Sequence, residues 1–172
     1  MKKIEIKGKR NIDKLNKDIN PTRKDSLKWK LDDIYFTYKK QLEIVNCLYL
    51  EQAFLNDTSI EFFKKEIGKK IKGYYRQDID KKLLECNLFV TLDYVLELLV
   101  ESKLLCYYCR SECNLIYKEV LNKKQWTLDR IKNHLGHNCE NVVICCLECN
   151  IKRGEIDSNR FKMGKQLKIN KL

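Results

Sequence analysis

The chain has 172 residues and a formal net charge of +11, from 35 Lys or Arg against 24 Asp or Glu. This length suits one domain, or a small domain with an extension. A charge this positive favours a polyanionic partner, of which nucleic acid is the most common. The alternative is a lysine-rich surface that only keeps the protein in solution.

No apolar run reaches the roughly 18–20 residues that a membrane span needs. The lysine-rich start of the chain lacks the apolar segment of a secretory signal. We therefore expect an intracellular protein, in the cytoplasm or nucleus of its host, with no membrane partner. Residues 1–24 are expected to form a basic arm that is unstructured alone or follows phosphates when bound.

Residues 25–103 form a predicted helical region, which starts with a long amphipathic helix. Apolar residues recur at steps of three and four from Leu27 through Val45 to Tyr49, which predicts one helix from about Ser26. The stripe suits helix packing without chemistry, and it leaves open a homodimer formed through this first helix.

Two further helices are predicted in the same region. A second apolar stripe runs from Ile60 to Tyr74, and Thr58 with Glu61 has the spacing of a capping box at its start. A third helix is expected from Thr91 to about Ser102. The predicted helical region thus holds three helices with apolar faces.

Two Cys-x-x-Cys pairs follow, Cys106-Tyr-Tyr-Cys109 and Cys146-Leu-Glu-Cys149. In a reducing compartment, nine cysteines argue for metal binding rather than disulfides. Each pair offers two thiolates from one tight turn, and two pairs complete a tetrahedral zinc site. A structural zinc would also stabilise a segment too small to bury much core.

Other cysteines leave alternatives open. Cys113 and Cys145 lie close enough to the pairs to replace one of the four ligands. Cys47 and Cys86 lie in the helical region and are expected to be small buried apolar groups.

The residues between the pairs predict a ββα unit. Trp126 to Ile131 has strand-forming residues, a loop with Gly136 follows, and Val142 to Ile144 gives a short second strand. A helix is expected from Cys149 onwards. Zinc would tie this unit to the first cysteine pair.

The order CYYC, WTLDRI, GH, ENVVICCLECNIKRG resembles the HNH, or His-Me finger, endonucleases in their four-cysteine zinc version. The resemblance covers 106–154, under a third of the chain. It implies an α+β fold, mostly helical, in which an HNH-like zinc domain at 104–160 follows the helices and a basic tail occupies 161–172. It also suggests a viral or mobile-element origin.

The family hydrolyses phosphodiester bonds with one divalent ion. The resemblance places that ion, magnesium or manganese, on Asp129 and Asn150, whose oxygens suit such metals. It also matches Asn141 to the asparagine that holds the loop between the strands and so positions the catalytic residue.

The departure from the family pattern is Arg130, which stands where the family has the histidine that activates water. Arginine stays protonated and cannot take that proton, but it can hold a phosphate through two hydrogen bonds. The base would then be His137 or, less readily, His134, or there would be none.

Lys152, Arg153 and Arg160 place positive charge on and after the final helix, where the resemblance implies contact with nucleic acid. The sequence therefore predicts a metal-dependent endonuclease that binds and cleaves DNA. The alternative is a catalytically inactive HNH-like zinc module that binds nucleic acid in a regulatory or structural role.

Overall fold

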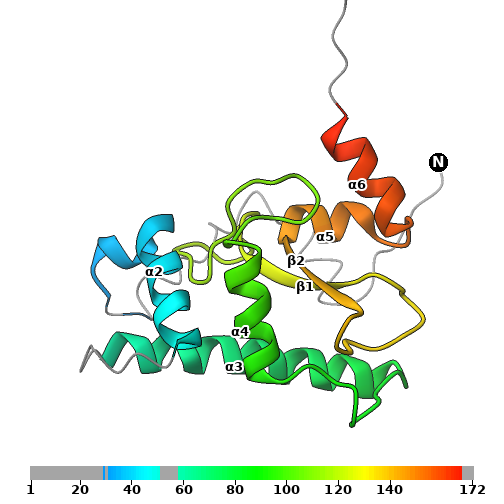
Figure 1. Cartoon of the computed structure of the whole chain (residues 1–172), viewed down its shortest axis with the longest axis horizontal. Coiled ribbons are helices and arrows are strands. Elements are labelled where there is room, and N and C mark those ends of the chain that lie inside the picture. The colour runs from blue at the N-terminus through cyan, green and yellow to red at the C-terminus, as the bar shows by residue number, and fades with distance from the viewer. Residues whose placement is uncertain (1–28, 30, 51–57, 168–172) are drawn as a thin grey trace, which may run out of the picture.

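The computed structural model describes residue 29, residues 31–50 and residues 58–167. The elements are the 3-10 turn η2 (Asp33–Phe36), the helices α2 (Tyr38–Tyr49), α3 (Thr58–Asp80) and α4 (Leu92–Glu101), the strands β1 (Trp126–Arg130) and β2 (Val142–Cys146), and the helices α5 (Leu147–Arg153) and α6 (Ser158–Gln166). The predicted α+β class is confirmed. Helix α3 runs along one side of the molecule, with α4 standing across it and the two strands and α5 beyond (Figure 1).

The first predicted helix is shorter than expected. Thr37 has an extended backbone, and its hydroxyl accepts a hydrogen bond from the Lys40 amide, so Thr37 caps a new helix that begins at Tyr38. Residues 33–36 before it form only a 3-10 turn. The prediction of one continuous helix up to Tyr49 is therefore wrong among the residues described here, while 26–28 and the basic arm lie outside them.

The inward face of α2 packs mainly on α4 of the same chain. Ile44, Val45 and Leu48 are buried there beside the polar Gln41. The Gln41 amide nitrogen donates to the Ile116 carbonyl at 3.2 Å, and its oxygen accepts from the Leu115 amide at 2.6 Å. Much of the stripe that suggests a dimer thus has a partner within the chain, and the homodimer stays a prediction.

The second and third predicted helices are confirmed. In α3 the residues Phe63, Ile67 and Tyr74 of the predicted stripe are buried. Helix α4 begins where expected, because the Thr91 hydroxyl accepts a hydrogen bond from the Tyr94 amide at 3.2 Å. The Thr58 side chain lies outside the described part, so the predicted capping box is untested.

Strands β1 and β2 form the expected antiparallel pair, in a register that places Trp126 opposite Cys146 and Arg130 opposite Val142. The chain turns directly from β2 into α5, which begins at Leu147 and therefore earlier than the predicted start at Cys149. Helix α6 continues to Gln166, so the first half of the predicted basic tail at 161–172 is helical.

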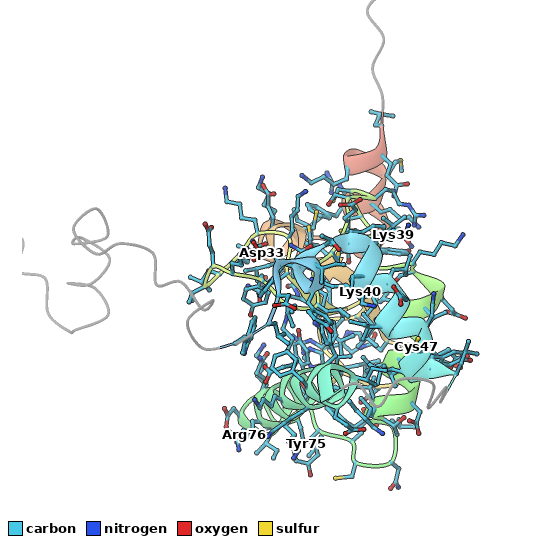
Figure 2. All side chains as sticks on the ribbon, turned by 90° about the vertical axis from the view of Figure 1, so that its left-hand side faces the viewer. Asp33, Lys39, Lys40, Cys47, Tyr75 and Arg76 are labelled. Atoms are coloured by element: carbon cyan, nitrogen blue, oxygen red, sulfur yellow. The ribbon has the colours of Figure 1, made fainter. Side chains whose placement is uncertain are left out.

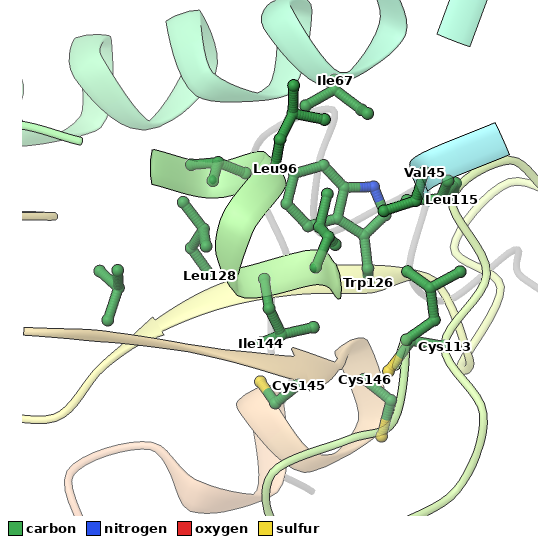
Figure 3. Close-up of a cluster of buried hydrophobic side chains, with 14 of the residues drawn as sticks. Val45, Ile67, Leu96, Cys113, Leu115, Trp126, Leu128, Ile144, Cys145 and Cys146 are labelled. Atoms are coloured by element: carbon green, nitrogen blue, oxygen red, sulfur yellow. The ribbon is translucent and has the colours of Figure 1, made fainter. Parts of the chain in front are cut away.

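One hydrophobic core joins the helices to the strands. Trp126 is 1% exposed and projects from β1 among apolar side chains of the helical region, including Val45, Ile67 and Leu96 (Figure 3). The amino-acid composition changes near residue 103, where the cysteine-rich segment begins, but the hydrophobic core continues across this point. The proposed division of the chain at 103/104 stays a prediction.

Many of the charged side chains point outward from this core. Lys39 on α2 and Arg76 on α3 are exposed and extend away from the ribbon (Figure 2). In the part of the chain that the structure describes, no helix combines the length and the apolar character required to cross a membrane.

Candidate functional site

The two predicted cysteine pairs come together as one cluster. Cys106 and Cys109 lie in a tight turn after α4, in which the Arg110 amide donates to the Cys106 carbonyl at 2.9 Å. Cys146 ends β2, and Cys149 lies in the first turn of α5. The Tyr107 amide also donates to the Ile144 carbonyl at 2.9 Å, which fixes the first turn against β2.

The four sulfur atoms fit a tetrahedral zinc ion. All lie within 4.8 Å of one another, and Cys109 Sγ is 3.9 Å from Cys146 Sγ. Zinc–sulfur bonds of about 2.3 Å set tetrahedral sulfur–sulfur separations of about 3.8 Å. Burial and then the neighbouring Cys106 sulfur raise the pKa of Cys149 to about 12, so a cation is needed for these groups to ionise together. The cluster supports the predicted metal site.

Two nearby cysteines stay outside this group. Cys145 points to the other side of β2, where its sulfur lies 3.1 Å from the Thr127 hydroxyl and burial raises its pKa. Cys113 is fully buried and does not belong to the four-sulfur group. The ligand set named from the Cys-x-x-Cys spacing is therefore the one that the fold assembles.

Next to the cluster, a cavity of about 460 Å³ gathers most of the remaining predicted site residues. It opens between α3, the end of β1, the following loop and α5. Asp129, Arg130, His137, Asn150 and Arg153 all line it. Residues that the sequence spreads over a strand, a loop and a helix thus line one cavity.

Asp129 is 5% exposed and has both carboxylate oxygens engaged. Arg153 Nε lies 2.5 Å from Oδ2, and Arg153 Nη2 donates to Oδ1 at 2.9 Å. The Tyr108 hydroxyl donates to Oδ2 at 2.6 Å, and burial followed by this bond raises the pKa of Tyr108, so it stays a donor. Asp129 and Arg153 thus form a buried ion pair.

Arg153 is 3% exposed and also donates to the Arg130 carbonyl and the Asn133 side-chain oxygen. The sequence predicts a nucleic-acid contact for Arg153, but here its guanidinium is committed to the inside of the protein. Lys152 is exposed and paired with Glu148, and Arg160 is exposed on α6.

Asn141 holds the loop between the strands. Its oxygen accepts from the Lys132 amide at 2.9 Å, and its nitrogen donates to the carbonyls of Lys132 at 3.2 Å and Gly136 at 2.9 Å. The two arms of the loop are thus tied through one side chain, which is the geometry that the resemblance implies for this asparagine.

Asn150 faces the cavity from α5. Its nitrogen donates to the Thr127 hydroxyl at 3.0 Å and to the Leu128 carbonyl at 3.3 Å. Because the amide nitrogen is used in this way, the Asn150 oxygen is the atom that remains to meet a ligand.

His137 is 4% exposed and is anchored to α3 by one aspartate. Asp78 Oδ2 accepts from the His137 amide at 2.6 Å, and Asp78 Oδ1 lies 2.8 Å from His137 Nδ1. The imidazole also packs on the Tyr74 ring, with 4.6 Å between the centroids. Burial lowers the pKa of His137, although Asp78 opposes the shift, so the ring is neutral at neutral pH.

The loop reaches Asp78 only because residue 136 is glycine. A Cβ at Gly136 would lie 2.5 Å from the Leu83 carbonyl oxygen and 2.9 Å from Asp78 Oδ2. A side chain would therefore push the loop away from α3. The position of His137 depends on this close approach.

Arg130 also lines the cavity, but one of its terminal nitrogens donates to the carbonyls of Asn133 and Leu135, each at 3.0 Å. It braces the loop while leaving other guanidinium N–H groups for a ligand. His134 is exposed and is not among the residues that line the cavity. Of the two histidines, only His137 lies where chemistry in the cavity can use it.

Sequence reasoning missed Asp78 and Tyr108. Asp78 lies four residues after Tyr74 and therefore on the apolar face of α3. A carboxylate on an apolar helix face is a sign of a buried polar contact. Tyr108 lies inside the first cysteine pair, where nothing in the spacing points to Asp129. Comparison of the chain with protein-family models, curated proteins and solved structures found no match.

Proposed function

We propose that the protein is a DNA endonuclease of the HNH type that uses His137 as its general base. The supporting observation is the single cavity that brings together Asp129, Arg130, His137 and Asn150. Arg130 cannot act as the general base. His137 lies in the same cavity and can take that role.

The Asp78 contact defines how His137 acts. A carboxylate only accepts hydrogen bonds, so Nδ1 of the neutral ring carries the hydrogen and Nε2 has the free lone pair. In the proposed reaction, Nε2 takes a proton from water while the water oxygen bonds to phosphorus. The bond from phosphorus to the bridging deoxyribose oxygen breaks, and that oxygen leaves with the electron pair. Arg130 and Lys81 supply positive charge around the phosphate.

The donor set for a catalytic divalent ion does not fit this geometry. Arg153 and Tyr108 already engage both oxygens of Asp129. An ion would have to take the place of the guanidinium, so no step of the proposed reaction passes through one. The requirement for magnesium or manganese stays a prediction, and the test below includes reactions with and without either ion.

The experiment is a nicking assay on supercoiled plasmid with zinc-loaded protein, run without divalent ions and with added magnesium or manganese. His137→Asn keeps an N–H donor for Asp78 but has no basic nitrogen to take the proton, so we expect nicking to fall by about 10²–10⁴-fold, the usual contribution of a general base. His134→Asn is the matched control and should nick like the wild type. Equal nicking by wild type and His137→Asn, or no nicking by the wild type, would refute the proposal.

A second candidate function is a zinc module that binds nucleic acid without cutting it. The buried Asp129–Arg153 pair favours it, because Arg153 and Tyr108 already occupy both oxygens of Asp129 and leave neither for a metal ion or a substrate. The expected signature is binding that weakens steeply as salt rises, with no product under any metal condition. DNA as the partner is a proposal common to both functions.

A further inference from the structure

A second cavity, of about 480 Å³, adjoins the candidate active site. Tyr74, Gln77 and Asn150 line both cavities and form the boundary between them. Lining residues on α3 extend from Glu66 to Gln77, and Lys81 follows directly after the end of the helix. At 1.5 Å per residue the lining part of the helix is roughly 16 Å long, so the two cavities form one groove beside α3.

The second cavity has the chemistry of a nucleotide site. Trp29 and Tyr117 contribute aromatic rings, and Gln77 and Gln125 contribute amides. Lys70 is half-buried in the same wall, with its ammonium 4.8 Å from the centroid of the Trp126 ring and 5.8 Å from that of Tyr117.

The charges at this cavity favour an anionic ligand. Glu66 is already paired with Lys69 on the same helix. Burial lowers the pKa of Lys70 to about 7, so its amine can take up a proton when a phosphate enters the cavity. Lys70 also donates to the Trp126 carbonyl, which holds its amine at the cavity wall. Rings that stack on a base and an amine that meets a phosphate are the two features by which proteins bind single-stranded nucleic acid.

We infer that this cavity holds one unpaired nucleotide next to the phosphate in the candidate active site. The inference rests on the proposed function for the position of the scissile phosphate. The cavity suits a single nucleotide, so a base from a duplex must leave its stack to enter. The preferred substrate is then DNA with an unpaired nucleotide beside the cleaved bond, rather than intact duplex.

Gly73 gives a direct way to close the cavity. It lies in the wall formed by α3, and a Cβ built there meets no atom within 4 Å. Gly73→Leu therefore places an apolar side chain in the cavity wall from an unobstructed Cβ position and also favours the helix. Gly68, on the same helix, has equally open surroundings but is not among the lining residues, so Gly68→Leu is the matched control.

The test measures binding of a fluorescein-labelled thymidine oligonucleotide and of a blunt duplex by fluorescence anisotropy. No divalent ion is added, and gel electrophoresis of the recovered oligonucleotides checks that cleavage plays no part. We expect Gly73→Leu to bind the single strand about 5- to 150-fold more weakly, the effect of losing one base–aromatic stack. Gly73→Leu should bind the duplex as the wild type does. Gly68→Leu should bind both the single strand and the duplex as the wild type does. Tyr117→Ala should reproduce the loss.

The inference is overturned if Gly73→Leu and Tyr117→Ala bind the single strand as well as the wild type does. It is also overturned if both variants weaken single-strand and duplex binding equally. A wild-type protein that never nicks plasmid but loses single-strand binding in Gly73→Leu would refute the proposed hydrolysis and support the nucleotide site. Nicking by the wild type, together with unchanged single-strand binding by Gly73→Leu, would support the proposed hydrolysis and refute the nucleotide site.

Discussion

Replacing Arg153 with methionine tests whether the buried ion pair holds the candidate site together. Arg153 and Asp129 are 3% and 5% exposed. Methionine keeps most of the side-chain volume but leaves the Asp129 carboxylate buried with only the Tyr108 hydroxyl as a partner. Removal of one member of a buried pair typically costs 3–5 kcal/mol. We expect the free energy of unfolding of Arg153→Met to fall by about that amount.

The measurement is urea unfolding of the zinc-loaded protein, followed by tryptophan fluorescence. Lys152→Met is the matched control, because this neighbouring lysine is exposed and pairs with Glu148 only at the surface; its stability should not change measurably. Adding Asp129→Asn to Arg153→Met removes the uncompensated charge and should restore part of the loss. A change below about 1 kcal/mol in Arg153→Met, together with no coupling in the double variant, would refute this account of the pair.

Three further predictions address the metal, the loop and the buried histidine. Cys149→Ser should lower bound zinc, measured by elemental analysis, from one equivalent to well below one, and should abolish cooperative unfolding of the strand region. Gly136→Ala should lower the melting temperature measured by circular dichroism, because the new Cβ meets the Leu83 carbonyl at 2.5 Å; unchanged melting would show that the loop relaxes freely. Burial lowers the pKa of His137, so the unfolded chain binds the proton more tightly, and stability should decline as pH falls below about 6.5. His137→Asn should lack this part of the decline in urea titrations from pH 7.5 to 5, and an identical decline in both proteins would contradict it.

Local patterns in the sequence were sufficient for the cysteine cluster and the two strands. The Cys-x-x-Cys spacing dictates which sulfurs share a turn, and alternating apolar residues from Trp126 onwards dictate a buried strand. Asn141 makes hydrogen bonds to both arms of the loop between the strands, and the role that the resemblance implies for it stays a prediction. These features depend on neighbours in the chain or on a short motif.

The contacts that decide the chemistry depend on packing and could not be predicted. His137 receives its partner from a residue 59 positions earlier, and no periodicity links the two. Arginine is usually a surface residue. Arg153, however, lies three residues after Asn150 and therefore on the same face of α5, where it contacts Asp129. The sequence pattern did not reveal the break at Thr37, because the apolar stripe continues across it. The only local sign of a new helix start is the single hydroxyl side chain of Thr37, which caps α2.

The reach of Gln41 has a consequence for how the chain acquires its structure during synthesis. Its nitrogen also donates to the nearby Tyr35 carbonyl, but its bonds to Leu115 and Ile116 lie 74 and 75 residues later, so the full set of bonds forms only after that segment has been made. At roughly 5–20 residues per second, translation needs about 4–15 s to cover this separation. During that interval the apolar face of α2 has none of its later partners from the strand region, and the nascent chain is then most open to chaperones and to wrong association. Slow codons placed between these two points would lengthen that exposure.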